Sequence, residues 1–248
     1  LCAMCGVFYR LSATACFLLF TYVFLLEKAR YINHIYLTCL LTFMMIFLPV
    51  HRTWSFDAWR RPGLRSAVVP AWTLWLLQMQ IGIPYFFGGI ADWLQGEPLR
   101  AWLAKRTSFP LIGPYFTNEG VVWIMTYGSL LLDLLAVFLL LKRRTRVFWY
   151  LGLLIFHLVN SRLFGIGIFP WLMIPATLIF FEADWPRRIW RDFQGGTSPR
   201  IPRLIVGAAL GFLIGASMPG FFSIVQALSG ALGLAVAAYF LDEPFAEP

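Results

Sequence analysis

Charged side chains are scarce in this chain of 248 residues: only 13% of them are Asp, Glu, Lys or Arg, while 60% are hydrophobic. A water-soluble domain of this size could not bury so much apolar surface, whereas a lipid bilayer can solvate it. The composition therefore predicts an all-α polytopic transmembrane bundle without a large soluble domain.

Cysteine and histidine are also rare, with four and three copies in the chain. Cys2 and Cys5 form a CxxC pair, but no second pair or histidine cluster follows at the spacing that a metal site needs. Cys16 and Cys39 lie in apolar stretches, where small buried thiols are common. We expect neither a metal site nor a disulfide framework.

Nucleic-acid binding is excluded by the placement of charge, despite a net charge of +8. The basic residues fall in short loops between apolar stretches, as topology determinants of membrane proteins do. We therefore expect membrane lipid, and no nucleic acid, as a partner.

The apolar stretches are long enough for about eight membrane spans at roughly 20 residues each. We expect spans over 11–26, 31–49, 71–90, 121–141, two within 147–181 and two within 204–241. The break inside 147–181 is predicted at Asn160-Ser161-Arg162, and the last turn near Pro219-Gly220. A polar, amphipathic segment over 92–120 is expected to lie along the membrane interface.

The basic residues also predict the orientation. With eight spans, fourteen of the 20 basic residues fall on the side of the N-terminus and six on the other side. The positive-inside rule then places both termini in the cytoplasm. The same topology places Asn33-His34, Gly88-Gly89 and Asn160-Ser161-Arg162 on the exterior side.

Polar groups at one depth of an apolar bundle suggest a binding site, because leaving them in lipid is costly. Asn33 and His34 open one span, and imidazole exchanges protons near neutral pH. His157 and Asn160 share a helical face. Arg162 must extend its charge to the membrane surface, pair with a carboxylate such as Asp92 or Asp133, or bind an anionic ligand. The alternative interpretation of each polar residue is an interhelical hydrogen bond.

Several ordered motifs give the chain a resemblance to a known family. They are "YINHIYL", "WSFD", "VPAWTLWLLQMQIGIPYFFGGI", "DWLQGEPL", "GSLLLDLLAVFLLL", "FHLVNSRLFGIGIFPWLM" and "DWPRR". Their order and spacing resemble those of the vitamin K-dependent gamma-carboxylase family, and most closely its bacterial HTTM-domain relatives. The resemblance covers residues 8–188, whereas 189–248 is expected to hold a linker and two C-terminal spans of unknown role.

The resemblance implies an epoxidase and carboxylase-like lyase reaction. In that family, oxygenation of reduced vitamin K, or another quinol, produces a strong base that removes a proton from a substrate glutamate, and carbon dioxide is then added. Asn33 and His34 match the family's catalytic Asn-His pair. We expect His157, Asn160, Arg162, Asp92 and Trp93 to bind the quinol or a glutamate-containing peptide.

One departure from the family pattern concerns its catalytic lysine. The lysine belongs between the glycine-rich segment and the Asp-Trp pair, but here Ile90 is followed by Ala91 and then Asp92. No lysine occurs between Lys28 and Lys105. We therefore expect that this chain, as written, does not carboxylate glutamate.

Two further function classes stay open from the sequence. A non-catalytic membrane protein could bind lipid or a protein partner through the same pocket. A small-solute transporter is the third alternative, but the internal repeats typical of transporters are not visible. The resemblance places the protein in a bacterial inner membrane. Quinone-dependent chemistry would distinguish a carboxylase-like protein from a non-catalytic protein that binds lipid or a protein partner.

Overall fold

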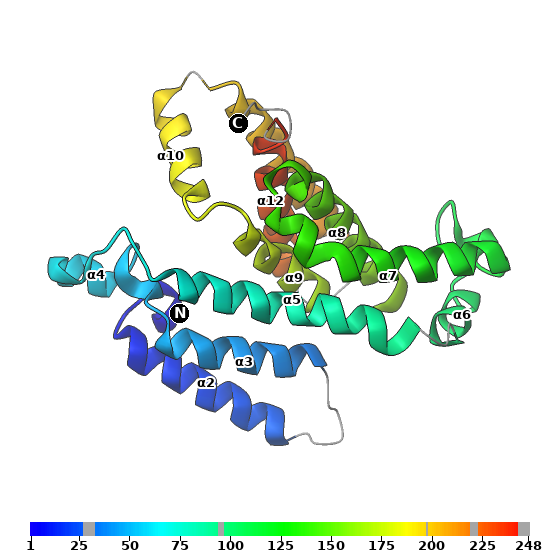
Figure 1. The fold of residues 1–248 in the computed structure, drawn as a ribbon, viewed down its shortest axis with the longest axis horizontal. Coiled ribbons are helices and arrows are strands. Elements are labelled where there is room, and N and C mark those ends of the chain that lie inside the picture. Colours follow the sequence, from blue (N-terminus) through cyan, green and yellow to red (C-terminus); the bar gives the residue numbers. More distant parts are fainter. Residues whose placement is uncertain (27–32, 94–96, 197, 219–222, 243–248) are drawn as a thin grey trace. The chain divides into compact units, whose positions relative to one another are not determined.

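The computed structural model describes residues 1–26, 33–93, 97–196, 198–218 and 223–242. Within these ranges the chain forms helices and connecting turns and no β-strand (Figure 1). The predicted all-α class is confirmed. The fold divides into two compact units, Leu1–Gln80 and Ile81–Pro248, which are described separately below.

The first unit is built on two apolar helices that lie side by side, α2 and α3 (Figure 1). Its elements are α1 (Cys2–Cys5), α2 (Tyr9–Leu26), α3 (Asn33–Phe47), η2 (Val50–Arg52), α4 (Phe56–Arg60), η3 (Pro62–Leu64) and the start of α5 (Ala71–Trp93). Most side chains of α2 are exposed although they are apolar. Such a surface is suited to lipid rather than to water.

One carboxylate fixes the start of α2. Asp57 accepts hydrogen bonds from the backbone N–H of Tyr9 at 2.8 Å and of Phe8 at 3.1 Å. The N–H groups of a first helical turn lack partners within the helix, so a carboxylate satisfies them well. These bonds, the Tyr9 one foremost, hold the pKa of Asp57 below its ordinary value. Ser55 begins α4 by accepting from the N–H of Ala58 at 3.0 Å.

The second unit contains the remaining helices. They are the end of α5, α6 (Glu97–Ala104), η4 (Gly113–Tyr115), α7 (Glu119–Leu141), α8 (Arg143–Phe164), α9 (Phe169–Ala176), η5 (Thr177–Phe180), α10 (Trp185–Gly195), α11 (Arg200–Ser217) and α12 (Ser223–Tyr239). Helix α7 packs on α8, α8 on α9, and α12 on both α8 and α9.

Polar groups reinforce the contact between α7 and α8. The indole N–H of Trp149 donates to the Leu132 carbonyl at 3.1 Å, and the Arg146 Nε donates to the Leu140 carbonyl at 3.0 Å. The Tyr150 hydroxyl donates to the Ile174 carbonyl at 3.0 Å and so ties α8 to α9. Buried polar groups satisfied in this way hold spans together where lipid offers no hydrogen bonds.

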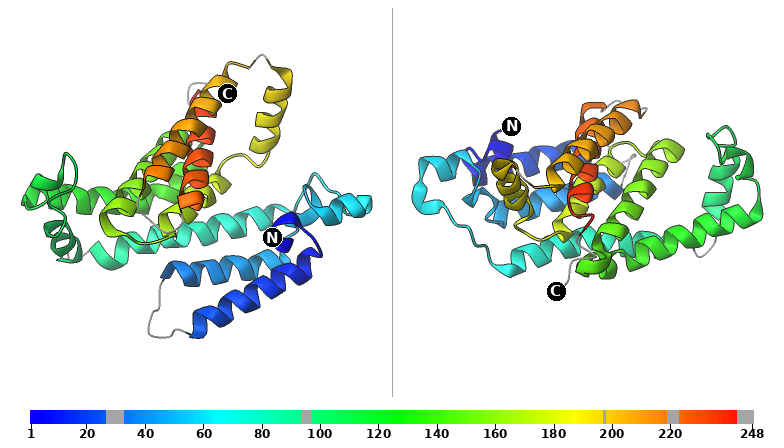
Figure 2. Two further views of the ribbon diagram at one scale, coloured as in Figure 1. Left: turned by 180° about the vertical axis from the view of Figure 1, so that it is seen from behind. Right: turned by 90° about the horizontal axis from the view of Figure 1, so that it is seen from above.

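Small residues let α11 and α12 approach closely (Figure 2). Gly207, Gly211 and Gly215 are the buried residues of α11, and all three face the backbone of α12. A methyl group on Gly211 would overlap the backbone of Gly230. This spacing of small residues is typical of membrane-helix pairs in close contact. The two predicted C-terminal spans therefore form a hairpin, which packs on α8 and α9 through α12.

The predicted break at Asn160-Ser161-Arg162 is wrong in position. Helix α8 continues through these residues and ends at Phe164, where Gly165 adopts the left-handed conformation with φ 59°. Glycine takes up this conformation without a steric penalty, so it ends helices more effectively than the polar residues before it. Polar side chains in a last helical turn do not by themselves stop a helix.

The length and the apolar composition of the helices indicate which of them can cross a membrane. Among the described residues, four helices are long and apolar enough to span a bilayer: α2, α7, α8 and α11. Three shorter apolar helices cover Asn33–Phe47, Phe169–Phe180 and Ser223–Tyr239. The chain is thus an integral membrane protein, whereas the count of eight spans and the cytoplasmic termini stay predictions. The predicted turn at Pro219-Gly220 lies outside the described residues.

Candidate functional site

A cavity of about 970 Å³ lies within the second unit, between the end of α5 and helices α6, α7, α8 and the residues up to Phe169. Its wall is mainly apolar and aromatic. Its volume is at the upper end of the roughly 300–1,000 Å³ typical of small-molecule sites. Two polar regions interrupt the apolar wall, and they differ in burial and in charge.

The first region, which we call the floor, consists of Tyr85, Asp133 and His157. Tyr85 comes from α5, Asp133 from α7 and His157 from α8, and all three side chains are buried. The Tyr85 hydroxyl lies 2.9 Å from His157 Nε2 and 2.7 Å from the hydroxyl oxygen of Thr177. This tyrosine therefore joins α5 to α8 and to η5.

The direction of the hydrogen bonds follows from counting donors. The Thr177 hydroxyl donates its only hydrogen to the Met173 carbonyl at 2.8 Å, so it accepts from Tyr85. Tyr85 also has a single hydrogen, so it accepts from His157 Nε2. The proton of the neutral imidazole is thus on Nε2, and Nδ1 carries a lone pair.

His157 Nδ1 has no hydrogen-bond partner within the described part of the chain, although the side chain is only 2% exposed. The same holds for Oδ1 of Asp133, whose side chain is 8% exposed. A buried acceptor without a donor is costly, so such atoms need an explanation. Both residues line the cavity, so the two unpartnered acceptors lie in its wall.

Aromatic rings surround the imidazole. The ring centroids of Phe156, Tyr85 and Phe169 lie 5.6 Å, 5.8 Å and 6.1 Å from that of His157. These distances are in the range of favourable aromatic contacts. The floor can therefore hold a planar ring and offer hydrogen-bond acceptors at its edge.

The second polar region, which we call the mouth, consists of Trp102, Lys105 and Arg106. All three side chains are exposed and line the cavity. The Trp102 ring lies 5.5 Å from that of Phe164, at the end of α8. The mouth thus combines an aromatic surface with two positive charges.

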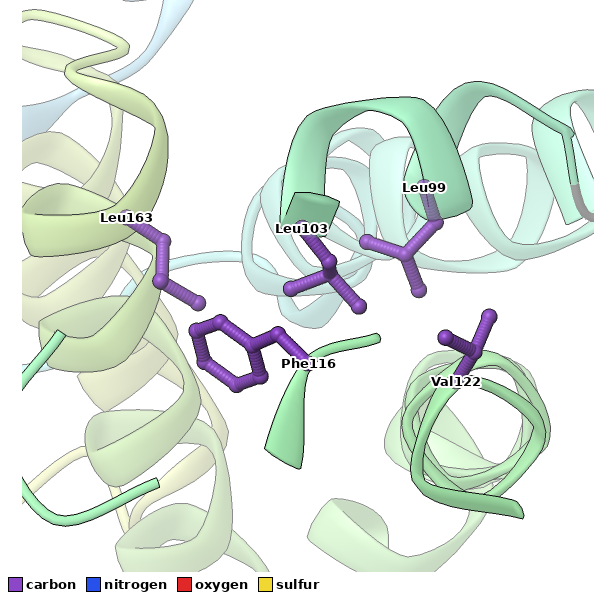
Figure 3. Packing of buried hydrophobic residues seen from close by; sticks show 5 residues of the cluster. All are labelled: Leu99, Leu103, Phe116, Val122 and Leu163. Atoms are coloured by element: carbon purple, nitrogen blue, oxygen red, sulfur yellow. The ribbon is translucent and has the colours of Figure 1, made fainter. Parts of the chain in front are cut away.

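A small apolar cluster positions the mouth (Figure 3). Its buried residues are Leu99, Leu103, Phe116, Val122 and Leu163, which come from α6, the segment after η4, α7 and α8. At its edge, Arg100 donates to the Glu119 carboxylate at 2.8 Å. The segment 92–120, predicted only as an interfacial loop, therefore contains a helix that is packed on the bundle.

The sequence-predicted site residues have different locations. His157 and Asn160 both line the cavity, whereas Arg162 is exposed at the last turn of α8 and is not among the lining residues. Asp92 and Trp93 belong to α5, but their side chains fall outside the described part of the chain.

Asn33 and His34 start α3 in the first unit, with Asn33 exposed and His34 half-buried. Their predicted catalytic role, and the predicted convergence of His34 with Asn160 and Arg162, stay predictions.

Sequence reasoning missed Tyr85, Thr177 and the mouth residues. The available signals were weak: Tyr85 follows Pro84 in an apolar stretch, and Lys105-Arg106 follows an amphipathic segment. Asp133 was considered only as a partner for Arg162. No group of three or more His, Cys, Asp or Glu residues suited to a metal ion occurs among the described residues.

Comparison with known protein families gives a match over most of the chain. The sequence model of a family described as HTTM domain matches residues 1–185, which covers most of the chain and all of the cavity residues. No solved structure matches the chain.

Proposed function

Because the chain belongs to the HTTM domain family, we propose that it binds a quinol-type ligand in the cavity, with His157 Nδ1 as the hydrogen acceptor. The observation that carries this proposal is the unpartnered acceptor pair of the floor, His157 Nδ1 and Asp133 Oδ1, in a cavity whose wall is mainly apolar. A hydroquinone has an apolar ring and two hydroxyl donors, which is the complement of this surface.

The hydrogen-bond network supports an acceptor role for His157. Since Thr177 and Tyr85 fix the proton on Nε2, the lone pair of Nδ1 is available to a ligand hydroxyl. An imidazole in this tautomer accepts a hydroxyl proton without first losing one of its own. The same contact would orient the ring for deprotonation.

We propose further that the chain does not carboxylate glutamate. The family's catalytic lysine segment is missing after Ile90, and a general base must lie within about 3 Å of the proton that it removes. Quinol binding then persists without efficient carboxylation. Whether Asn33 and His34 supply a base is a separate proposal, taken from the family resemblance alone.

The binding test uses the full chain in neutral phosphatidylcholine nanodiscs under anaerobic conditions. Vitamin K hydroquinone and its oxidised quinone form a matched pair of probes, because only the hydroquinone has O–H donors. We expect the hydroquinone to bind about 30-fold more tightly, since each of the two acceptors can form a buried hydrogen bond that contributes about 1 kcal/mol. His157→Phe should remove most of this preference.

A second variant tests the location of the ligand. Gly128 lies on the cavity wall, and apart from its chain neighbours and the backbone of its own helix no atom lies within 4 Å of the position its Cβ would take. Gly128→Leu should therefore weaken both probes without a steric clash. Equal affinity of hydroquinone and quinone for the unmodified chain, or undiminished binding to Gly128→Leu, would overturn the proposal.

Carboxylation is tested with vitamin K hydroquinone, a glutamate peptide and labelled bicarbonate. The matched variant carries an inserted Ala-Lys-Leu-Asn segment after Ile90. We expect no label incorporation by the unmodified chain. Robust incorporation would show that the lysine is dispensable.

A further inference from the structure

We propose that the mouth of the cavity is a binding site for an anionic phospholipid, whose phosphate is bound by Lys105 and Arg106 and whose acyl chain enters the cavity. This site goes beyond quinol binding and does not depend on it. The observation that carries it is a pair of cations on the wall of a cavity whose lining is mainly apolar.

The two cations are available to a ligand. Lys105 and Arg106 are adjacent, exposed and directed to the same cavity, and neither side chain has an acidic partner among the described side chains. The neighbouring Arg100, by contrast, pairs with Glu119 at 2.8 Å. An ammonium and a guanidinium side by side match a phosphate, which accepts several charge-assisted hydrogen bonds.

The acid of the cavity lies far from this pair. The mouth is held beside Val122 through Leu99 and Leu103, and Asp133 follows eleven residues later on the same helix. At 1.5 Å per residue this separation is roughly 16 Å along α7. The carboxylate of Asp133 in the floor is therefore too far away to neutralise the positive charges of Lys105 and Arg106 at the mouth.

The remaining wall suits a hydrocarbon chain. Next to the cations it offers Trp102, Phe164 and Ile166, and the ring of Trp102 is half exposed. Tryptophan favours the membrane interface because one part of its ring is apolar and its N–H is polar. A free phosphate would use the cations but leave this apolar surface empty, which favours a lipid over an inorganic anion.

The test is photo-crosslinking of the full chain in nanodiscs with phosphatidylglycerol that carries a diazirine in its acyl chain. Crosslinked peptides are identified by mass spectrometry. We expect labelling of the segment 156–169, and weak labelling there by a phosphatidylcholine probe with the same chains. Unlabelled phosphatidylglycerol should compete, whereas inorganic phosphate or glycerophosphate at the same concentration should not.

The double variant Lys105→Gln/Arg106→Gln should shift the midpoint of labelling about 30-fold, since both direct charge-assisted contacts to the phosphate are lost. The matched control, Lys142→Gln/Arg144→Gln, removes the same charge at exposed positions that do not line the cavity. It should change the midpoint less than about 3-fold.

Unchanged labelling in Lys105→Gln/Arg106→Gln would overturn the proposal, as would equal competition by inorganic phosphate, which would indicate a free-anion site. Hydroquinone binding is measured separately, with the unmodified chain and His157→Phe in phosphatidylcholine, where the anionic lipid is absent. Failure of the lipid site and failure of the quinol site are thereby distinguished.

Discussion

Replacing Tyr85 with phenylalanine removes a single buried oxygen that connects three helical elements. The hydroxyl accepts from His157 Nε2 at 2.9 Å and donates to Thr177 at 2.7 Å. The ring stays in place, so packing around it is conserved. The variant therefore isolates the contribution of the two hydrogen bonds to stability.

The expected loss is about 2–5 kcal/mol in the free energy of unfolding. Interhelical hydrogen bonds in membrane proteins contribute about 0.6 kcal/mol on average and up to about 1.7 kcal/mol. Here the imidazole N–H is also left buried without an acceptor, which adds a desolvation cost of about 1–3 kcal/mol. The larger part of the effect thus comes from the unsatisfied group.

The assay is reversible unfolding of the purified protein in mixed micelles. Tyr127→Phe is the matched control, because Tyr127 is 53% exposed on α7 and should change stability by less than about 0.5 kcal/mol. A double-mutant cycle with Thr177→Val should give a coupling energy of about 0.6–1.7 kcal/mol. If Tyr85→Phe is as stable as Tyr127→Phe, or the coupling is zero, the network does not hold the floor together.

Three further predictions concern packing, pH and topology. Gly211→Ala should destabilise the α11–α12 hairpin by about 1–3 kcal/mol in the same assay, because its methyl group overlaps the Gly230 backbone, while Gly128→Ala in open space should not destabilise. The contact of Asp57 with the start of α2 should be present above pH 3.8, the ordinary pKa, and lost as pH falls through the lower folded pKa. Hydrogen exchange at the Phe8 and Tyr9 amides measures this, and Asp57→Asn should abolish the pH dependence. Single cysteines at Ser66 and Lys105 should label from opposite sides of the membrane; labelling from one side would refute the predicted topology.

The helices of the fold could be predicted, because one continuous apolar stretch of the sequence is enough to indicate a membrane helix. The predicted span 71–90 corresponds to α5 over Ala71–Trp93, and 121–141 to α7 over Glu119–Leu141. The predicted end of α8 at Asn160-Ser161-Arg162 is misplaced, because the left-handed Gly165 ends the helix. Local backbone conformation decided that boundary, and side-chain polarity did not.

The polar residues in and around the cavity could be predicted only in part. His157 and Asn160 were identified, because polar residues on one face of an apolar helix are unusual. The hydrogen-bond network around His157 could not be predicted. Tyr85 lies 72 residues before His157 and Thr177 lies 20 residues after it, and no helical periodicity relates positions so far apart. Lys105 was missed because an exposed lysine in a polar segment has no distinguishing sequence context.

Nitrogen NMR of the histidine side chains tests the central claim most directly, since the chain has only three histidines and single substitutions assign them. In the free protein, His157 should be neutral, with its proton on Nε2 and an unprotonated Nδ1. Vitamin K hydroquinone should shift the Nδ1 resonance by hydrogen bonding, and the oxidised quinone should leave it unchanged. A proton on Nδ1 in the free protein, or a Nδ1 resonance that does not respond to the hydroquinone, would contradict the proposed role of His157.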